Sequence, residues 1–288
     1  MPAIKIHRGV RPSCNEQYLS KDTWLTSGKR EEQNKTPEKT IDFDDRRPVD
    51  PSLIQSRYRS ICRLTISANG KQYLGTGFLL AADMIMTAAH NLKPFSSVTI
   101  DLAVHGTTPA VATRTVDMDD WFVPPNYPSD KFADFGLIKL NRPFQLRQNQ
   151  VLFRPLEITP QTHSRLAVER LQITGYPLTV CLPPTNKCVY NFPNQMYLGQ
   201  DDYSNLTSLP TKFPSVVLHQ IDTSPGQSGA PLFAYKLPVK EGDYFYAPFI
   251  GVHISSYNGG PFNLACLVTK QMRNAIATFA PHVSNWRF

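Results

Sequence analysis

The stretch that most constrains the fold of this chain is residues 222–233, Asp-Thr-Ser-Pro-Gly-Gln-Ser-Gly-Ala-Pro-Leu-Phe, with Ser228 at its centre. A serine hydroxyl attacks a carbonyl only when a base takes its proton and nearby donors stabilise the oxyanion. Gly226 permits a sharp turn with φ > 0. Such a turn can aim the N–H groups of Gly226 and Ser228 at one point, as an oxyanion hole, while Gly229 and Ala230 leave space beside the hydroxyl. By itself this stretch favours an ordinary surface turn, so a catalytic interpretation requires a base and an acid elsewhere.

A candidate base and a candidate acid both stand upstream of the serine. His90 ends the apolar segment 78–90 after the small residues Thr-Ala-Ala, and Asp134 directly precedes the apolar strand candidate 135–140. The order histidine, aspartate, serine is one of several unrelated chain orders in which this triad occurs. The sequence therefore predicts a catalytic triad of His90, Asp134 and Ser228, and a fold that brings three distant segments together.

Short strand candidates separated by turn residues fill the chain from residue 61 onward. Proline outnumbers glycine, 25 to 15, which favours turns over long helices. The candidates are 61–66, 73–80, 84–87, 98–104, 110–116 and 135–140, then 171–175, 188–192, 195–199, 216–221, 230–235, 244–253 and 263–268. Asn69-Gly70 predicts a tight hairpin turn, and residues 269–279 have the apolar spacing of a terminal α-helix. The pattern predicts an all-β fold, in which two six-stranded antiparallel barrels would bring the triad together.

Three regions follow from this pattern. Residues 27–40 are almost wholly polar and cannot bury a core, so we expect residues 1–40 to be an N-terminal extension. The first barrel, with His90 and Asp134, is expected over residues 41–160. The second barrel, with Ser228 and the terminal helix, is expected over residues 161–288.

Composition excludes several functional classes. Hydrophobic residues are 41% and charged residues 18% of the chain, as in a globular protein, and no apolar run approaches the length of a membrane-spanning helix. The net charge of +7 favours acidic partners, but no basic helix or aromatic-interleaved basic stripe suggests nucleic-acid binding. We therefore expect polypeptide substrates, and no membrane or nucleic-acid partner. Metal-ligand spacing is absent, and the predicted chemistry needs no cofactor.

The five cysteines and the start of the chain are less decisive. Cys181 and Cys188 flank a short Pro-rich loop and could form a disulfide, and Cys62 and Cys266 are best explained by core packing; the fifth is Cys14. The first ten residues lack the apolar core of a secretory signal. Either export uses another route, the signal is missing from this sequence, or the protein stays inside the cell.

The motifs resemble those of a known clan. Thr-Ala-Ala-His90 together with Gly226-Gln-Ser228-Gly resembles the chymotrypsin-like serine proteases, and the resemblance narrows to the bacterial glutamyl endopeptidases of the staphylococcal and bacillus type. It covers about residues 41–280 and is carried by residues 41–49 with 58–61, 134–141, 175–177 with 221–231, and 251–256. Departures are Pro225, where the family commonly has glycine, and the insert 181–214. A disulfide that brackets the catalytic histidine in many clan members is absent.

The resemblance implies a serine endopeptidase that prefers glutamate, and more weakly aspartate, at the P1 position. Thr223 and His253 stand where the family binds the substrate carboxylate, and Ser256 is a third candidate donor. A carboxylate in a partly dry pocket needs such donors. The alternative for His253 is a core histidine at a strand end, and His219 is expected to be structural.

Two other functions stay open at this point. The chain could be a non-catalytic protein that binds a peptide or partner on the same scaffold, or a peptidase with another P1 preference. The resemblance also implies a secreted protein whose first 38 or so residues are a removable pro-segment, cut after Glu38 by the enzyme itself. The alternative is a flexible tail on which activity does not depend.

Overall fold

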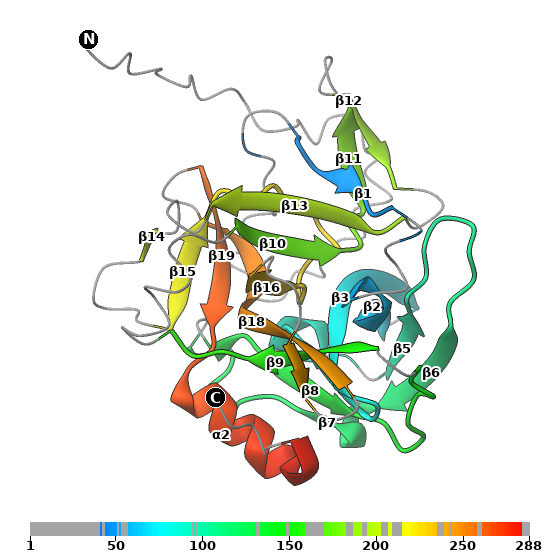
Figure 1. Ribbon diagram of the computed structural model, residues 1–288, viewed down its shortest axis with the longest axis vertical. Helices are drawn as coiled ribbons and strands as arrows, with labels where there is room; N and C mark the ends of the chain where they lie inside the picture. Colours follow the sequence, from blue (N-terminus) through cyan, green and yellow to red (C-terminus); the bar gives the residue numbers. More distant parts are fainter. Residues whose placement is uncertain are drawn as a thin grey trace.

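A computed structural model of the chain describes most of its residues from 41 onward (Figure 1). The described residues are 41, 44–50, 52, 57–68, 70–93, 95, 97–130, 133–147, 150–158, 170–182, 187–191, 195–202, 207–208, 215–234, 239–241, 244–257 and 261–283. The expected extension, residues 1–40, lies outside them. No helix among the described residues is long and apolar enough to cross a membrane.

Within the described part of the chain, the first sheet has seven antiparallel strands in the order β6-β5-β2-β3-β4-β8-β7. Their bounds are β2 Ile61–Ala68, β3 Lys71–Ala81, β4 Met84–Thr87, β5 Ser97–Leu102, β6 Ala112–Asp117, β7 Trp121–Phe122 and β8 Gly136–Lys139. β2 alternates buried and half-buried side chains over most of its length, as expected of a strand with one face toward a core. The hairpin between β2 and β3 turns at Gly70, whose φ of 74° is the left-handed value that the Asn-Gly pair predicts.

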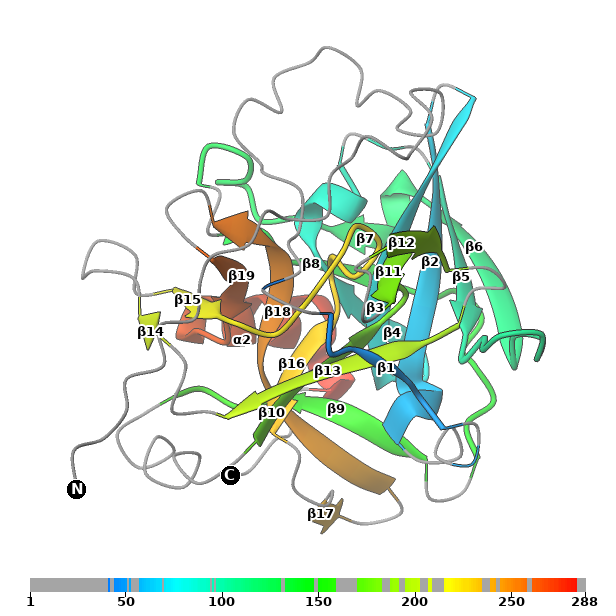
Figure 2. The same cartoon turned by 90° about the horizontal axis from the view of Figure 1, so that it is seen from above.

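The second sheet has ten strands among the residues that the structure describes. Six of them, β13-β10-β16-β18-β19-β15, form its continuous centre, with β1 and β14 at the two ends and β9 and β17 paired to β18. Their bounds are β1 Arg47–Pro48, β9 Val151–Pro155, β10 Arg170–Gly175, β13 Tyr197–Asp202, β14 Thr207–Ser208, β15 Val216–His219, β16 Pro231–Ala234, β17 Val239–Glu241, β18 Tyr244–Tyr257 and β19 Phe262–Leu267. Figure 2 shows the two sheets side by side, with β2, β5 and β6 on one flank and β14, β15 and β19 on the other.

A separate two-stranded hairpin pairs β11 (Thr179–Leu182) with β12 (Lys187–Tyr190). Cys181 and Cys188 lie opposite each other in this hairpin and form a disulfide. Cys62 and Cys266 are buried and outside this disulfide, as expected of core residues.

The C-terminal helix α2, Lys270–Phe279, confirms the helix expected over residues 269–279. The Thr269 hydroxyl caps it by accepting a hydrogen bond from the N–H of Met272 at 3.2 Å. Met272 and Ile276, one turn apart, form its buried face. The ring of Phe279 lies 5.9 Å from that of Phe122 on β7, so the helix is anchored against the first sheet. Short 3-10 helices are also present: η3 Arg57–Ser60, η4 Ala89–Asn91, η5 Met118–Asp120 and η8 Pro281–Val283.

The expected fold class is confirmed: the protein is all-β, with two barrel-like sheets and a C-terminal helix. A cluster of phenylalanines joins the sheets, because Phe78 of β3 stacks edge-on against Phe153 of β9 and Phe249 of β18, at 5.1 and 4.9 Å between ring centroids. The strand numbers differ from six and six, since short edge strands extend both sheets.

Two segments lie in the second sheet although the sequence suggested the first. β1 pairs with β13, and β9 runs parallel to β18 with Phe153 opposite Ala247 (Figure 1). β1 has only two residues and β9 ends in Pro155. Neither shows an alternation of apolar and polar residues that could assign it to one of the sheets.

Candidate active site

The register of the first sheet brings His90 and Asp134 together. Thr87 of β4 pairs with Gly136 of β8, so the histidine that follows β4 and the aspartate that precedes β8 lie at the same end of the sheet. His90 Nδ1 is 2.8 Å from Asp134 Oδ2, and the His90 backbone N–H donates to Asp134 Oδ1 at 2.9 Å. The Asp134 side chain is fully buried and that of His90 is 20% exposed. The carboxylate holds Nδ1, and Nε2 lies on the opposite edge of the ring.

Ser228 lies in a turn between β15 and β16 that requires glycine on both sides. Gly226 has φ 98° and Gly229 has φ 89°, both left-handed. A Cβ at Gly226 would lie 2.4 Å from the Tyr176 carbonyl oxygen, and one at Gly229 would lie 2.2 Å from that of Thr76. Ser228 is half-buried, and its hydroxyl donates to the Ile254 carbonyl of β18 at 3.3 Å. The sharp turn predicted from the sequence therefore has the backbone conformation that it was expected to need.

Side-chain and backbone groups of the first barrel form hydrogen bonds with the Ser228 turn. We call this set of contacts the inter-barrel joint. The carbonyl oxygen of Ser228 accepts from the Thr76 N–H and from Asn91 Nδ2, both at 2.9 Å. Thr76 Oγ1 donates to the Gly226 carbonyl at 2.7 Å. Since Asn91 follows His90 directly, the loop that carries the histidine is bonded to the turn that carries the serine.

The inter-barrel joint was not predicted from the sequence, although one glycine in the sequence is related to it. Gly75 lies on β3 beside Asn91, and a Cβ there would come within 2.7 Å of Asn91 Nδ2. The glycine thus leaves room for the amide. A glycine inside a strand is equally typical of a bulge or a bend, however, so the sequence alone does not point to this contact.

The residues expected to bind a P1 carboxylate are all buried beside the Ser228 turn. His253 on β18 exchanges backbone hydrogen bonds with this turn: its carbonyl accepts from Gly229 N–H at 2.8 Å, and its N–H donates to the Ala230 carbonyl at 2.9 Å. Thr223 is fully buried, and its hydroxyl has no hydrogen-bond partner among the described residues. Ser256 lies further along β18 and is 4% exposed.

His219 of β15, which was expected to be structural, contacts His253. Its Nε2 is 3.3 Å from Nδ1 of His253, and both rings are fully buried. Burial, and then the neighbouring His253, lower the pKa of His219 well below its usual range, so this ring is neutral. β15 and β18 both pair with β19, with His219 opposite Asn263 and His253 opposite Ala265. Only the order of the strands in the sheet shows that the two histidines are neighbours.

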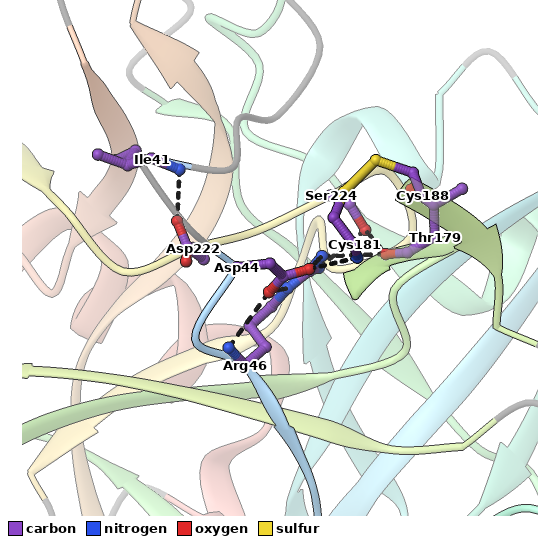
Figure 3. Close-up of a disulfide and its surroundings, with 8 residues drawn as sticks. All are labelled: Ile41, Asp44, Arg46, Thr179, Cys181, Cys188, Asp222 and Ser224. Atoms are coloured by element: carbon purple, nitrogen blue, oxygen red, sulfur yellow. Dashed lines mark hydrogen bonds and ion pairs between the residues drawn. A yellow bond between two sulfur atoms is a disulfide. The ribbon is translucent and has the colours of Figure 1, made fainter. Parts of the chain in front are cut away.

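The Asp222 side chain is hydrogen-bonded to the segment that precedes β1. The backbone N–H of Ile41 donates to its carboxylate (Figure 3), and so does that of Asp45, at 3.0 Å. Burial raises the pKa of Asp222 to about 8; the two N–H groups oppose this shift, and the nearby carboxylates of Asp45 and Asp44 add to it. Folding therefore favours the protonated form of Asp222.

This pKa predicts a pH-dependent stability. Unfolded Asp222 loses its proton near pH 3.8 and the folded residue near pH 8, so the folded state binds the extra proton between these values. The free energy of unfolding of the protein should therefore fall as the pH rises through this window, by at most about 1.4 kcal/mol per pH unit. In denaturant titrations at pH 5 and 7.5, Asp222→Asn should show a smaller fall than the wild type. Asp50→Asn, at an exposed carboxyl whose pKa is lowered below 3.8, is the control and should keep the wild-type fall. Equal slopes for the wild type and Asp222→Asn would contradict the assignment.

Among the described residues, no group of three or more His, Cys, Asp or Glu side chains could hold a metal ion.

Comparison with known proteins identifies the class. The family model of the trypsin-like peptidase domain matches residues 75–236, more than half of the chain, and the chain belongs to this family. Among solved structures, a Glu endopeptidase in complex with MPD aligns with a TM-score of 0.56 and 18% identity, over 86% of this chain and 100% of that one. The protease Anisep from Arthrobacter nicotinovorans aligns with a TM-score of 0.54 and 14% identity, over 77% and 96%. The fold is that of the chymotrypsin-like serine proteases. No curated protein sequence matches the chain.

Proposed function

We propose that this protein is a serine endopeptidase that works through His90, Asp134 and Ser228. The observation that carries the proposal is the contact between the buried Asp134 carboxylate and His90 Nδ1, at 2.8 Å. The loop that carries His90 is in turn hydrogen-bonded to the Ser228 turn. A binding protein without catalysis has no need of a buried carboxylate that orients a histidine whose side chain is 20% exposed.

The geometry supports one reaction sequence. Ser228 Oγ attacks the substrate carbonyl while His90 Nε2 takes its proton, and Asp134 stabilises the imidazolium. The N–H groups of Gly226 and Ser228 bind the oxyanion. The tetrahedral intermediate collapses to an acyl-enzyme as His90 gives its proton to the leaving amine. A water molecule activated by His90 then hydrolyses the acyl-enzyme, so no cofactor enters the cycle.

The proposed P1 preference is for glutamate. Buried donors suit a buried carboxylate, and a substrate carboxylate would satisfy the Thr223 hydroxyl. Neutral His219 can donate from Nε2 to His253 Nδ1, which keeps the His253 proton on Nε2 for the substrate. Ser256 is the third proposed donor. The Glu endopeptidase among the structural relatives fits this preference.

A digest of denatured mixed proteins tests the preference. Cleavage should fall after Glu and less after Asp, since the longer side chain reaches donors that the shorter one misses. His253→Ala should lower kcat/KM on Glu substrates by about 10- to 100-fold, the loss of a hydrogen bond to a charged group. It should change cleavage after other residues much less. His282→Ala, at an exposed histidine bonded to Asp83, is the matched control and should leave both rates unchanged.

The rival functions predict different results. Cleavage chiefly after Lys, Arg or aromatic residues would reject the pocket while leaving a peptidase. A non-catalytic binding protein would cleave nothing and would not react with a fluorophosphonate, whereas a peptidase should be labelled at Ser228.

Two further proposals concern the boundaries between the N-terminal extension, the first barrel and the second barrel. Residues 1–40, outside the described residues, are proposed to be a pro-segment that the enzyme removes, which would make the full chain a zymogen. The segment that follows already docks on the second sheet, through Ile41 on Asp222 and Val49 on Met196. The second region is proposed to begin at residue 161, with β9 of the preceding region paired to β18 of the second sheet.

A further inference from the structure

An ion pair with both side chains buried lies in the segment that leads into β1. Arg46 Nη2 is 2.6 Å from Asp44 Oδ2, and the two side chains are 0% and 2% exposed. Arg46 Nε also donates to Asp44 Oδ1 at 2.8 Å, so the contact is bidentate. A buried ion pair stabilises the folded state only when its other donors and acceptors also have hydrogen-bond partners. The remaining partners of this pair therefore identify the segments that it holds together.

The remaining donors of Arg46 point at the loop before Ser228. Nη1 donates to Ser224 Oγ at 2.9 Å and to Gln227 Oε1 at 2.7 Å. Gln227 Oε1 also accepts from the Ser224 backbone N–H at 3.1 Å, so the guanidinium and the loop share one acceptor. Gln227 is fully buried and directly precedes Ser228.

The disulfide hairpin closes the network from the other side (Figure 3). The carbonyl oxygen of Thr179 accepts from Arg46 Nη2 at 3.0 Å and from Ser224 Oγ at 2.8 Å. Asp44 Oδ2 accepts from the N–H of Cys181 at 2.6 Å, and Cys181 is tied to Cys188. Three segments far apart in sequence thus meet at one guanidinium.

We propose that Arg46 is a positioning residue that aims the oxyanion hole; this inference rests on the proposed function. The N–H of Ser228 belongs to the peptide group that joins it to Gln227. Because left-handed glycines stand on both sides, at 226 and 229, the turn has backbone freedom that must be removed elsewhere. Arg46 removes it by holding the Gln227 side chain. It touches neither substrate nor the reacting atoms in this role.

The role predicts which kinetic constant changes. A misaimed oxyanion hole binds the transition state less well but leaves ground-state contacts in place, so kcat falls and KM does not. Loss of a whole oxyanion donor costs about 10²–10³ in kcat, so a donor that is present but less well aimed should cost about 10- to 100-fold.

Two variants test this without leaving Asp44 as an unpaired buried charge. Arg46→Lys keeps the charge beside Asp44 but cannot reach Asp44, Gln227 and Thr179 together. The double variant Asp44→Leu with Arg46→Met removes both charges. The control is Arg63→Met, which breaks another Arg–Asp pair of the same length, 2.6 Å to Asp101, in the first sheet.

Three measurements separate positioning from stability: kcat and KM per site titrated with fluorophosphonate, the melting temperature, and amide hydrogen exchange at residues 224–228. Arg46→Lys should lose about 10- to 100-fold in kcat with KM within about twofold, and should exchange faster in this loop. Arg63→Met should change the melting temperature only. Wild-type kcat per titrated site in Arg46→Lys, or an equal loss of kcat in Arg63→Met, would overturn the proposal. If the wild type neither cleaves nor is labelled, the peptidase proposal fails, and the exchange data still decide whether Arg46 orders the loop.

Discussion

Replacing Ser228 by alanine should lower kcat by about 10⁶-fold, the usual loss when a triad serine is removed. The half-buried hydroxyl donates to the Ile254 carbonyl at 3.3 Å, a long bond whose loss should cost little stability, so the fold should persist. Hydrolysis of a peptide substrate and the melting temperature together check the prediction. Ser52→Ala, at an exposed serine bonded to Asp50, is the control and should keep wild-type activity. A purified Ser228→Ala sample that cleaves as fast as the wild type would show that another residue is the nucleophile.

The same variant carries the test of self-processing. If the enzyme removes its own first residues, intact mass during incubation should fall for the wild type and stay constant for Ser228→Ala. A wild type that stays full length while fully active would exclude the pro-segment. Equal shortening of both samples would leave processing by another protease and exclude self-cleavage.

Replacing Asp134 by asparagine should lower kcat by about 10⁴-fold at neutral pH, as loss of the triad carboxylate does in other serine proteases. The carboxylate accepts from both the ring and the backbone N–H of His90. An amide of the same shape can hold the ring in the wrong tautomer, with the proton on Nε2, where it cannot accept the Ser228 proton. Steady-state kinetics on one substrate measures the loss.

The control for this prediction is another aspartate of the first barrel. Asp120 accepts from the side-chain amide of Asn141 at 3.0 Å, away from His90. Asp120→Asn should therefore keep nearly full activity. Loss of activity in Asp120→Asn, with activity kept in Asp134→Asn, would reverse the assignment.

What the sequence predicted well depends on local or periodic signals. The fold class follows from short strands and turns, the hairpin from Asn69-Gly70, and the helix from apolar spacing that Met272 and Ile276 fulfil. The left-handed conformation of Gly226 follows from the steric demands of one turn, whereas that of Gly229 was not predicted. The catalytic roles stay predictions, although the predicted base and acid are in contact.

What the sequence could not predict depends on partners far along the chain. Residues 42–47, Asp-Phe-Asp-Asp-Arg-Arg, have the pattern of a solvated charge run, yet Asp44 and Arg46 are buried because their partners stand at positions 179–227. The contact between His219 and His253 likewise follows from sheet order, which no local pattern encodes. Nothing in a strand of two residues, such as β1, tells which sheet it will extend.

The inter-barrel joint contains no sulfur. Its members are the Thr76 N–H and hydroxyl, the Asn91 amide and the backbone carbonyls of Gly226 and Ser228. Thiol reductants open a disulfide but leave amide and hydroxyl hydrogen bonds intact, so the alignment of histidine with serine does not depend on an oxidising environment. The disulfide among the described residues sits instead in the β11–β12 hairpin, behind Arg46. In a reducing solution, therefore, the inter-barrel joint would persist, and loss of the Cys181–Cys188 disulfide would act on the β11–β12 hairpin that contacts Asp44 and Arg46.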